Sequence, residues 1–343
     1  MIPVHILTGF LGVGKTTFLN NVFDEDRSNG QVDFSSTAVI INEFGEVSLD
    51  HLLVEKGADG VIELSSGCLC CAVRGEFIDT LERLLARSDE EGRKLTSIIV
   101  ETTGIADPAP VLHAILAHPL LSRRLTLGNV VTLVDVTNGL ETLETYPEAQ
   151  RQVGLADYVV LTKADMLDDK PDDELLAIVR NLSSAQLISS EDAMPVFALE
   201  DGGGVKSLSS LDLKTAPESR HTKSVHSFAI VDDEALSFAD VCSFLAALTA
   251  HFGARLLRVK GLVRVKEEDD RPFLVQGVQS AYDRCGQLDC WPDDNRQTRL
   301  VFISDGVNDA EIRSLYNGFS NKIGIDQPDR VALTENPLAI PGV

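Results

Sequence analysis

The sequence is poor in basic residues and contains no long hydrophobic run. Its 343 residues include 30 lysines and arginines against 53 aspartates and glutamates, which gives a net charge of −23. Such a charge repels phosphate backbones and anionic membrane surfaces, so we expect no nucleic acid and no membrane as partners. The chain does not start with a basic segment followed by apolar residues, and no apolar run approaches a membrane span in length. We therefore expect a cytoplasmic protein.

Cysteine is also scarce, but its six residues are unevenly placed. In a reducing compartment we expect thiols and not disulfides. Cys68, Cys70 and Cys71 lie within four residues of one another. Thiolates are soft ligands that favour Zn²⁺ or Cu⁺. The spacing differs from that of a structural zinc knuckle, and adjacent cysteines are awkward ligands for one ion. The motif therefore predicts an open metal site, with buried, reduced cysteines as the alternative.

Residues 9–16 read Gly-Phe-Leu-Gly-Val-Gly-Lys-Thr and follow a short apolar run. This spacing is that of a phosphate-binding loop (P-loop) that opens a helix. Gly9, Gly12 and Gly14 would let the backbone turn its N–H groups against phosphate oxygens. Lys15 would place its charge on the β- and γ-phosphates, and the Thr16 hydroxyl can bind Mg²⁺. The sequence therefore predicts a nucleotide site.

Short apolar runs alternate with helical stretches from residue 1 to about 200, which is typical of a parallel sheet with crossover helices. We expect strands at residues 4–7, 38–41, 60–64, 97–100, 130–134, 158–161 and 195–198. Helices are expected to start at Lys15, Val73, Pro108, Glu141 and Asp172.

The pattern changes at residues 201–223, where glycine, serine, lysine, proline and glutamate occur without periodicity, as in a linker. Beyond it we expect strands at residues 225–231, 255–265, 273–278 and 300–303, and helices at 236–252 and 309–318. The predicted fold class is α/β: a P-loop NTPase domain with a mostly parallel sheet (1–200), a linker (201–223), a smaller C-terminal α+β domain (224–325) and a tail (326–343).

Acidic residues follow two of the predicted strands. Glu43 and Glu46 come after the second strand, where their carboxylates could reach Mg²⁺, a water or a second metal. A polar turn that caps a helix is the alternative. Glu101 follows the fourth strand, where it can handle Mg²⁺ or the attacking water, or else cap a loop. Gly104, just beyond, would allow a backbone N–H to approach the γ-phosphate.

Residues 162–165, Thr-Lys-Ala-Asp, end the sixth predicted strand. Asp165 can accept hydrogen bonds from the N1 and N2 donors of guanine, which adenine does not offer in that pattern. The stem of Lys163 can lie over the plane of the base. The familiar guanine-reading tetrad begins with Asn, and Thr162 stands in its place. Guanine remains the predicted base because Asp165 carries most of the discrimination.

Together these motifs resemble those of the CobW-like GTPases, a branch of the SIMIBI-class P-loop proteins that includes zinc metallochaperones and relatives acting in cobalamin synthesis. The resemblance covers almost the whole chain. It rests on residues 7–17, 42–46, 67–71, 101–108 and 162–165, and on residues 257–263, 276–279 and 299–303 in the second domain. Residues 42–46 together with the Cys-x-Cys-Cys motif are its most specific part.

The resemblance implies a slow GTPase that uses GTP, GDP and Mg²⁺ and binds Zn²⁺ or a similar ion, with Co²⁺ as a second option. It would couple GTP hydrolysis to metal delivery to a client metalloprotein. It places Val13 and Thr17 with the rest of the loop on the phosphates and Mg²⁺. It makes the three cysteines of the motif ligands of the transferred metal, with Glu43 or Glu46 as an oxygen ligand. Many relatives carry a His-rich tract after the GTPase domain. In this chain residues 201–223 contain a single histidine, His221.

Because residues 42–50 and the cysteine motif both leave the same edge of the predicted sheet, we expect them to be neighbours. The γ-phosphate would then change metal affinity, and the metal would change nucleotide affinity by the same factor. A cobalt-handling GTPase of cobalamin synthesis or a metalloenzyme activator shares every motif. A small-molecule kinase, and a metal-binding or thiol module with a vestigial nucleotide site, are rivals of other classes. The sequence does not decide whether the protein forms a homodimer. It also does not identify a fourth metal ligand, for which His118 is a candidate.

Overall fold

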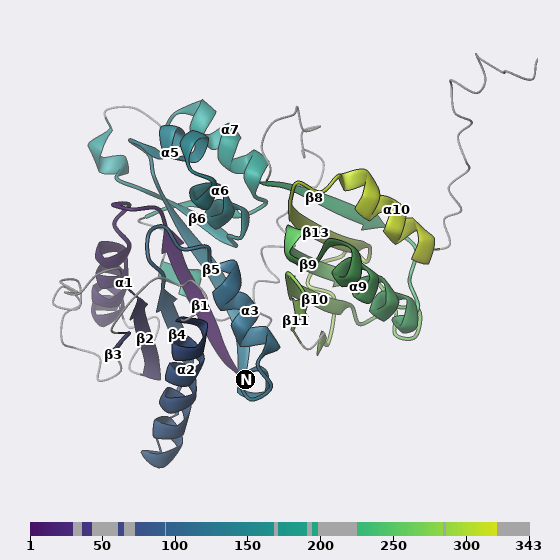
Figure 1. The fold of residues 1–343 in the computed structure, drawn as a ribbon, viewed down its shortest axis with the longest axis horizontal. Coiled ribbons are helices and arrows are strands. Elements are labelled where there is room, and N and C mark those ends of the chain that lie inside the picture. The colour runs from purple at the N-terminus through teal and green to yellow at the C-terminus, as the bar shows by residue number, and fades with distance from the viewer. Residues whose placement is uncertain are drawn as a thin grey trace, which may run out of the picture.

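The computed structural model describes residues 1–29, 36–42, 61–64, 73–92, 94–167, 171–190, 194–197, 225–283 and 286–320. Two sheets organise these ranges (Figure 1). Within them the first sheet has seven strands in the order β3-β2-β4-β1-β5-β6-β7, and the second has six strands. The prediction of an α/β P-loop domain followed by a smaller α+β domain is confirmed. The linker predicted at residues 201–223 and the tail at 326–343 lie outside the described residues.

The first sheet is parallel in every described pairing. β1 (Ile2–Gly9) lies between β4 (Ser97–Glu101) and β5 (Leu125–Asp135). β2 (Thr37–Asn42) and β3 (Val61–Leu64) extend one side, and β6 (Tyr158–Thr162) and β7 (Gln186–Ser189) extend the other. Because all strands run the same way, their carboxyl ends meet at one edge of the sheet.

Helices cover both faces of this sheet, so its central strands are buried along nearly their whole length and are mainly apolar. One face packs against α2 (Val73–Glu90), α3 (Ala109–Ala117), α6 (Pro147–Gly154) and α7 (Asp173–Leu182). The opposite face packs against α1 (Lys15–Asn29). Two short helices, α4 (Leu121–Arg124) and α5 (Gly139–Thr145), complete the domain. None of the helices in the described part of the chain is long and apolar enough to cross a membrane.

The strand predicted at residues 195–198 is wrong. Residues 194–197 form a 3₁₀ turn (Met194–Phe197), and the seventh strand is β7, earlier in the chain. Val196 and Phe197 are buried against the face that α1 covers, and Asn129 Nδ2 donates to the Val196 carbonyl at 2.8 Å. A short apolar run has no periodicity that separates a buried strand from a buried turn, and Pro195 lacks the N–H that a ladder needs.

The predicted helix starts are otherwise within two residues of those observed. α1 and α2 begin at Lys15 and Val73, as predicted, whereas α5 begins at Gly139 and not at Glu141. The helix α6 was not predicted. It follows α5 after a single residue and begins with a proline, and this proline suits a first helical turn.

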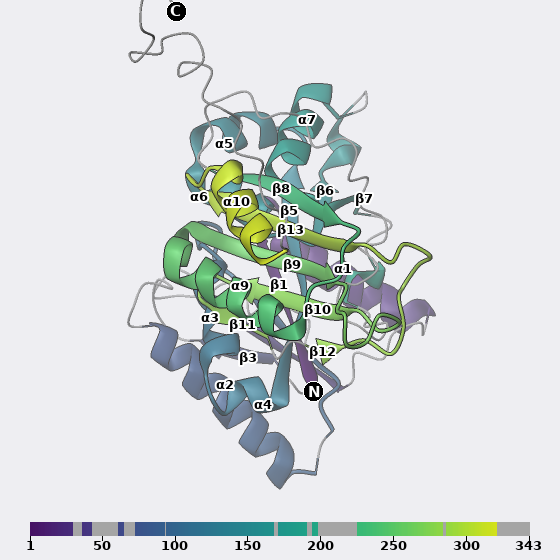
Figure 2. The same ribbon diagram turned by 90° about the vertical axis from the view of Figure 1, so that its right-hand side faces the viewer.

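The second sheet is antiparallel in its described ladders, in the order β11-β10-β9-β13-β8 with β12 beside β10. Its strands are β8 (Val225–Asp232), β9 (Leu256–Val263), β10 (Phe273–Val278), β11 (Ala281–Tyr282), β12 (Gly286–Gln287) and β13 (Thr298–Asp305). α9 (Phe238–Phe252) and α10 (Asp309–Phe319) lie on its outer face, and the first domain lies behind it (Figure 2).

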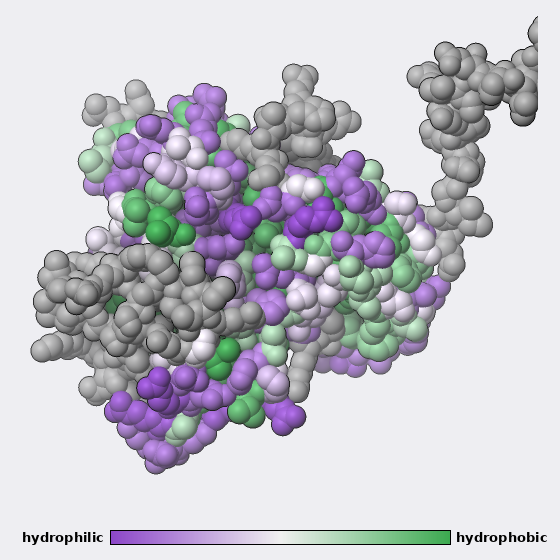
Figure 3. All heavy atoms as spheres, in the orientation of Figure 1, coloured by the Kyte–Doolittle hydropathy of each residue, from purple (hydrophilic) through white to green (hydrophobic). Residues whose placement is uncertain are grey.

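Both faces of this second sheet are covered, so all eight residues of β9 are buried. The surface differs between the two domains. It is hydrophilic over the free end of α2, while apolar residues are mixed with polar ones over the C-terminal domain (Figure 3).

Candidate nucleotide site

The P-loop joins the end of β1 to the start of α1. Gly9, Gly12 and Gly14 have φ angles of 145°, 74° and 90°, which side chains rarely adopt. The Lys15 side chain turns back over the loop, where its Nζ donates to the carbonyl oxygens of Gly9 at 2.9 Å and Phe10 at 3.4 Å. The ammonium group is therefore held at the loop, where phosphate oxygens would collect.

The first turn of α1 faces the same loop. The first helical hydrogen bond runs from Phe18 N to Gly14 O at 2.9 Å. The N–H groups of residues 15–17 precede it, so the positive end of the helix dipole points at the loop. Val13 is buried, and Thr17 is exposed at the helix start. The predicted loop residues thus form one backbone turn at the N-terminus of a helix, which suits an anion.

An oxygen pair lies beside the loop. Thr16 Oγ1 donates to Glu101 Oε1 at 3.1 Å, and Glu101 is only 3% exposed. The register of β1 against β4 pairs Leu7 with Glu101, which brings the end of β4 to the start of the P-loop. Hydroxyl and carboxylate oxygens are the ligands that Mg²⁺ prefers. Thr16 and Glu101 therefore fit a magnesium ion, and their role as its ligands stays a prediction.

The segment after β4 touches the P-loop directly. A Cβ atom on Gly104 would lie 2.8 Å from both N and Cα of Leu11, so only glycine allows this approach. From the other side, Gln152 of α6 donates to the carbonyl oxygens of Gly104 and Ala106 at 3.1 and 3.0 Å. No sequence motif pointed to Gln152. It is a polar residue on a short helix, and only the packing brings it to this segment.

The predicted base-reading segment is tied to the same loop. Thr162 Oγ1 donates to the Val13 carbonyl at 3.0 Å, so the hydroxyl that stands where the familiar tetrad has Asn connects this segment to the P-loop. Lys163 has a φ of 62°, and its Nζ lies 2.7 Å from Asp135 Oδ2. Asp165 follows in an exposed 3₁₀ turn (Ala164–Met166). Its carboxylate is therefore accessible to a ligand.

Asp135 is a site residue that the sequence reasoning missed. Burial alone would raise its pKa, but hydrogen bonds from Lys163, Thr137 and Asn138 outweigh this and lower the pKa to about 2. The carboxylate is therefore charged at neutral pH and holds Lys163 in place. Asp135 directly follows the apolar run at residues 130–134, which is the signal that led to Glu101 after β4.

Five predicted ligands of the transferred metal lie outside the described residues: Cys68, Cys70, Cys71, Glu43 and Glu46. His118, the candidate fourth ligand, directly follows α3, and its Nδ1 lies 3.7 Å from Glu82 Oε1. In the ranges that the structure describes, no group of three or more His, Cys, Asp or Glu side chains could hold a metal ion.

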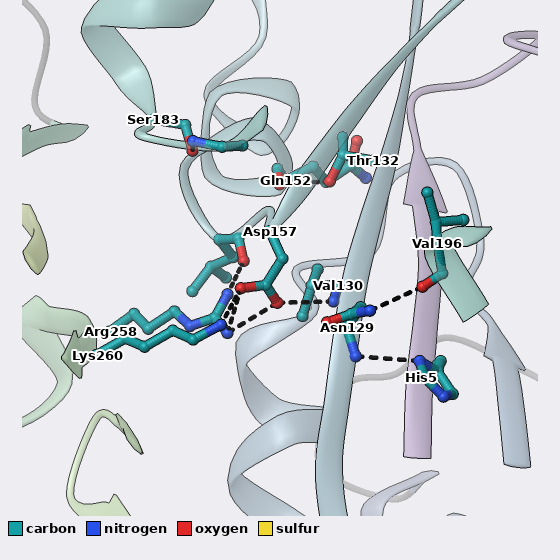
Figure 4. A network of polar contacts seen from close by, with 12 residues as sticks. His5, Asn129, Val130, Thr132, Gln152, Asp157, Ser183, Val196, Arg258 and Lys260 are labelled. Atoms are coloured by element: carbon teal, nitrogen blue, oxygen red, sulfur yellow. Dashed lines mark hydrogen bonds and ion pairs between the residues drawn. The ribbon is translucent and has the colours of Figure 1, made fainter. Parts of the chain in front are cut away.

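Buried charges join the two domains (Figure 4). Asp157, just before β6, accepts from Arg258 Nη2 at 2.9 Å and from Lys260 Nζ at 2.5 Å, both on β9. It also accepts from Val130 N at 2.9 Å, and Arg258 donates to the Leu155 carbonyl. Burial would raise the pKa of Asp157, but the two cations hold it well below its usual range. Burial lowers the pKa of Lys260, and Asp157 opposes that shift.

The fold and the loop define a P-loop nucleotide-binding protein of two domains. The model of the family "CobW/HypB/UreG, nucleotide-binding domain" matches residues 3–190, and that of the "Cobalamin synthesis protein cobW C-terminal domain" matches residues 225–319. The chain belongs to the CobW/HypB/UreG family. The predicted CobW-type GTPase is thereby confirmed at the level of the family.

Characterised relatives match over nearly the whole chain. It is 31% identical over 322 residues to the zinc chaperone YjiA of Escherichia coli, across 92% of this chain and 98% of the relative. It is 31% identical over 362 residues to the zinc chaperone CobW of Pseudomonas aeruginosa, across 91% and 89%. The crystal structure of Zn(II)-bound YjiA GTPase from E. coli matches with a TM-score of 0.62 and 26% identity, across 93% and 98% of the two chains.

Proposed function

We propose that this chain is a GTP-hydrolysing zinc chaperone that binds Zn²⁺ at its Cys-x-Cys-Cys motif and couples hydrolysis to metal delivery to a client metalloprotein. The observation that carries the proposal is the contact between Thr16 and Glu101 beside a complete P-loop. It occurs in a chain that is similar over 92% of its length to the E. coli zinc chaperone YjiA.

The nucleotide roles follow from the geometry of the loop. Lys15 and the N–H groups at the start of α1 would bind the phosphates, and Gly104 would lie near the γ-phosphate. Thr16 and Glu101 would hold Mg²⁺, which when bound neutralises charge on the β- and γ-phosphates. In hydrolysis a water oxygen bonds to the γ-phosphorus while the bond from that phosphorus to the β–γ bridging oxygen breaks. GDP keeps the bridging oxygen, and the water gives up a proton to the phosphate or to solvent, which releases GDP and phosphate. These residues position and stabilise the phosphates during that step.

Guanine recognition is assigned to the segment that Thr162 holds against the P-loop. Asp165 would accept from the N1 and N2 donors of guanine, and the Lys163 stem would cover the base. The ion pair of Lys163 with Asp135, at 2.7 Å, supports this role because it fixes the backbone that presents Asp165.

The metal cargo is assigned to Cys68, Cys70 and Cys71, with Glu43 or Glu46 as an oxygen ligand. Register supports the coupling to GTP. β2 and β3 are parallel neighbours that pair Asn42 with Leu64, so the two strands end side by side. Their carboxyl ends lie at the edge of the sheet that carries the P-loop. Linkage then requires that metal changes nucleotide affinity by the factor by which nucleotide changes metal affinity.

Zinc titration of the full chain, loaded with a non-hydrolysable GTP analogue or with GDP, tests this proposal. We expect zinc affinity to differ between the two nucleotide states and to be lost in Cys70→Ser. The matched control is Cys242→Ser on α9, an exposed cysteine of the second domain, which should leave zinc binding unchanged. Equal zinc affinity in both states would contradict the coupling.

Binding and activity measurements on the same variants separate the alternatives. If metal delivery survives Lys15→Ala but not Cys70→Ser, a thiol or metal module with a vestigial nucleotide site is favoured. Preference for adenine nucleotides, with transfer of phosphate to a small acceptor, would favour a kinase. Tighter binding of Co²⁺ than of Zn²⁺ would favour the cobalt-handling role.

A further inference from the structure

Gln152 is fixed on α6 by both its backbone and its side chain. It is 1% exposed, and its Nε2 donates to the carbonyl oxygens of Gly104 and Ala106 at 3.1 and 3.0 Å. Its own carbonyl accepts from Thr132 Oγ1 at 2.8 Å, and Figure 4 shows Gln152 beside Thr132 of β5. This glutamine therefore connects the centre of the sheet to the segment that contacts the P-loop.

The orientation of the Gln152 amide is determined by its neighbours. Two carbonyl oxygens face it, so its NH₂ group must point toward them. A flipped amide would place Oε1 against two acceptors. On the other side, Oε1 has no donor partner in the described part of the chain, so the orientation is set by the two carbonyl oxygens that face the NH₂ group. The side chain thus acts as a double donor to one short backbone segment.

Holding the Gly104 oxygen also orients the next N–H group. The described residues contain no cis peptide, so the Ile105 N–H points away from the Gly104 oxygen. That oxygen is on the α6 side because Gln152 binds it. Gly104 itself lies against Leu11 of the P-loop, where a Cβ would come within 2.8 Å of the backbone. The peptide between residues 104 and 105 therefore lies between α6 and the loop, with its N–H directed away from α6.

We propose that Gln152 is a positioning residue for GTP: it orients the peptide between Gly104 and Ile105 so that the Ile105 N–H binds the γ-phosphate. The inference rests on the proposed placement of the γ-phosphate beside Gly104. Gln152 does not touch the nucleotide and acts through the backbone. Because GDP has no γ-phosphate, the residue contributes to the preference for GTP over GDP and not to nucleotide binding in general.

The test is the ratio of affinities for a non-hydrolysable GTP analogue and for GDP, measured with Mg²⁺ on the full chain. Gln152→Glu keeps the size of the side chain but turns acceptor oxygens toward two carbonyls. We expect affinity for the GTP analogue to fall about 10- to 100-fold, the effect of one lost hydrogen bond to a charged group. Affinity for GDP should be retained. An unchanged ratio would overturn the inference.

Two further variants separate positioning from loss of structure. Gln152→Met has a similar shape without donors, and it should lower the ratio without bringing carboxylate oxygens to the carbonyls. Thr132→Val removes the hydrogen bond to the Gln152 backbone but leaves its side-chain donors in place. It should lower the melting temperature while the ratio stays that of the wild type. If Thr132→Val lowers the ratio as much as Gln152→Met does, the effect is structural and the inference is wrong.

Lys15→Ala distinguishes this inference from the proposed nucleotide site. If the wild type binds guanine nucleotides and Lys15→Ala loses both of them, the proposed site stands. An unchanged ratio in both Gln152 variants would then overturn the role of Gln152 alone. If Lys15→Ala binds both nucleotides as the wild type does, the proposed site itself is wrong, and the role of Gln152 falls with it.

Discussion

The two sheets of this molecule use polar residues in opposite ways. The parallel sheet gathers them at one edge, because all its strands end there, and the P-loop, Glu101, Asp135 and Thr162 meet at that edge. The antiparallel sheet has no such edge, because neighbouring strands run in opposite directions. Its charged residues Arg258 and Lys260 lie on a face instead, buried against the first domain. One arrangement builds a ligand site, and the other builds an interface.

Both uses of charged residues occur at the two ends of β6. Asp157 precedes it and is 4% exposed in the interface, whereas Asp165 follows it in an exposed turn. The two carboxylates belong to the same short stretch of chain, yet the first binds two cations of the other domain and the second has a side chain open to solvent. The comparison predicts that their removal affects different properties.

The largest expected effect is that of Asp157→Ala. It leaves Arg258 and Lys260 buried without their partner, which costs about 3–5 kcal/mol of unfolding free energy. Urea unfolding measures this cost. Asp165→Ala is the matched control and should change stability by less than about 0.5 kcal/mol while it weakens GDP binding. Similar stability losses in the two variants would break the comparison.

The next effect is a pH dependence from His5 on β1. Burial lowers its pKa to about 4, although Asp157 opposes the shift. Nδ1 accepts from Asn129 N at 3.1 Å (Figure 4). The unfolded chain takes up a proton near pH 6.5 and the folded chain only near pH 4, so stability falls as the pH decreases across that window. The expected loss from this residue is about 3 kcal/mol.

His5→Asn isolates this contribution. The Asn side chain keeps an oxygen that can accept from Asn129 N, but it does not titrate. Urea unfolding of both proteins at several pH values between 7 and 4 should show a flatter profile for the variant. Below about pH 4 both proteins should lose stability together, because the pKa of Asp157 is held below its usual range and its stabilising contribution is lost as the pH falls further. Parallel profiles from pH 7 to 4 would contradict the assignment to His5.

The smallest effect is expected for Arg151 of α6, which also joins the domains. Its guanidinium lies 3.1 Å from Asp107 Oδ2 and 2.6 Å from Asp305 Oδ2, and its side chain is 39% exposed. Because solvent screens such pairs, Arg151→Ala should cost no more than about 1 kcal/mol. The cost should shrink in 1 M NaCl. A larger cost that does not depend on salt would show that this pair behaves like the buried cluster of Asp157.

The sequence predicted those parts of the site whose residues are close together in the chain or directly follow a strand. The P-loop spacing is local, and Glu101 was found because it follows an apolar run. Asp135 carries the same signal and could have been found by the same argument. Residues 195–198 were misjudged because four apolar residues do not distinguish a strand from a buried turn. Gln152 had no local signal, since its partners are 46 and 48 residues away.

The sequence by itself determined the phosphate loop, most of the strands and helices, and the family, because each of these depends on the spacing of neighbouring residues. Only the tertiary structure decided which charges are buried. Asp157 and Lys260 are 103 residues apart, and nothing near either of them in the chain shows that they meet. Their pairing depends on how the two sheets pack, and the stability of a buried charge depends on that partner and not on its own sequence context.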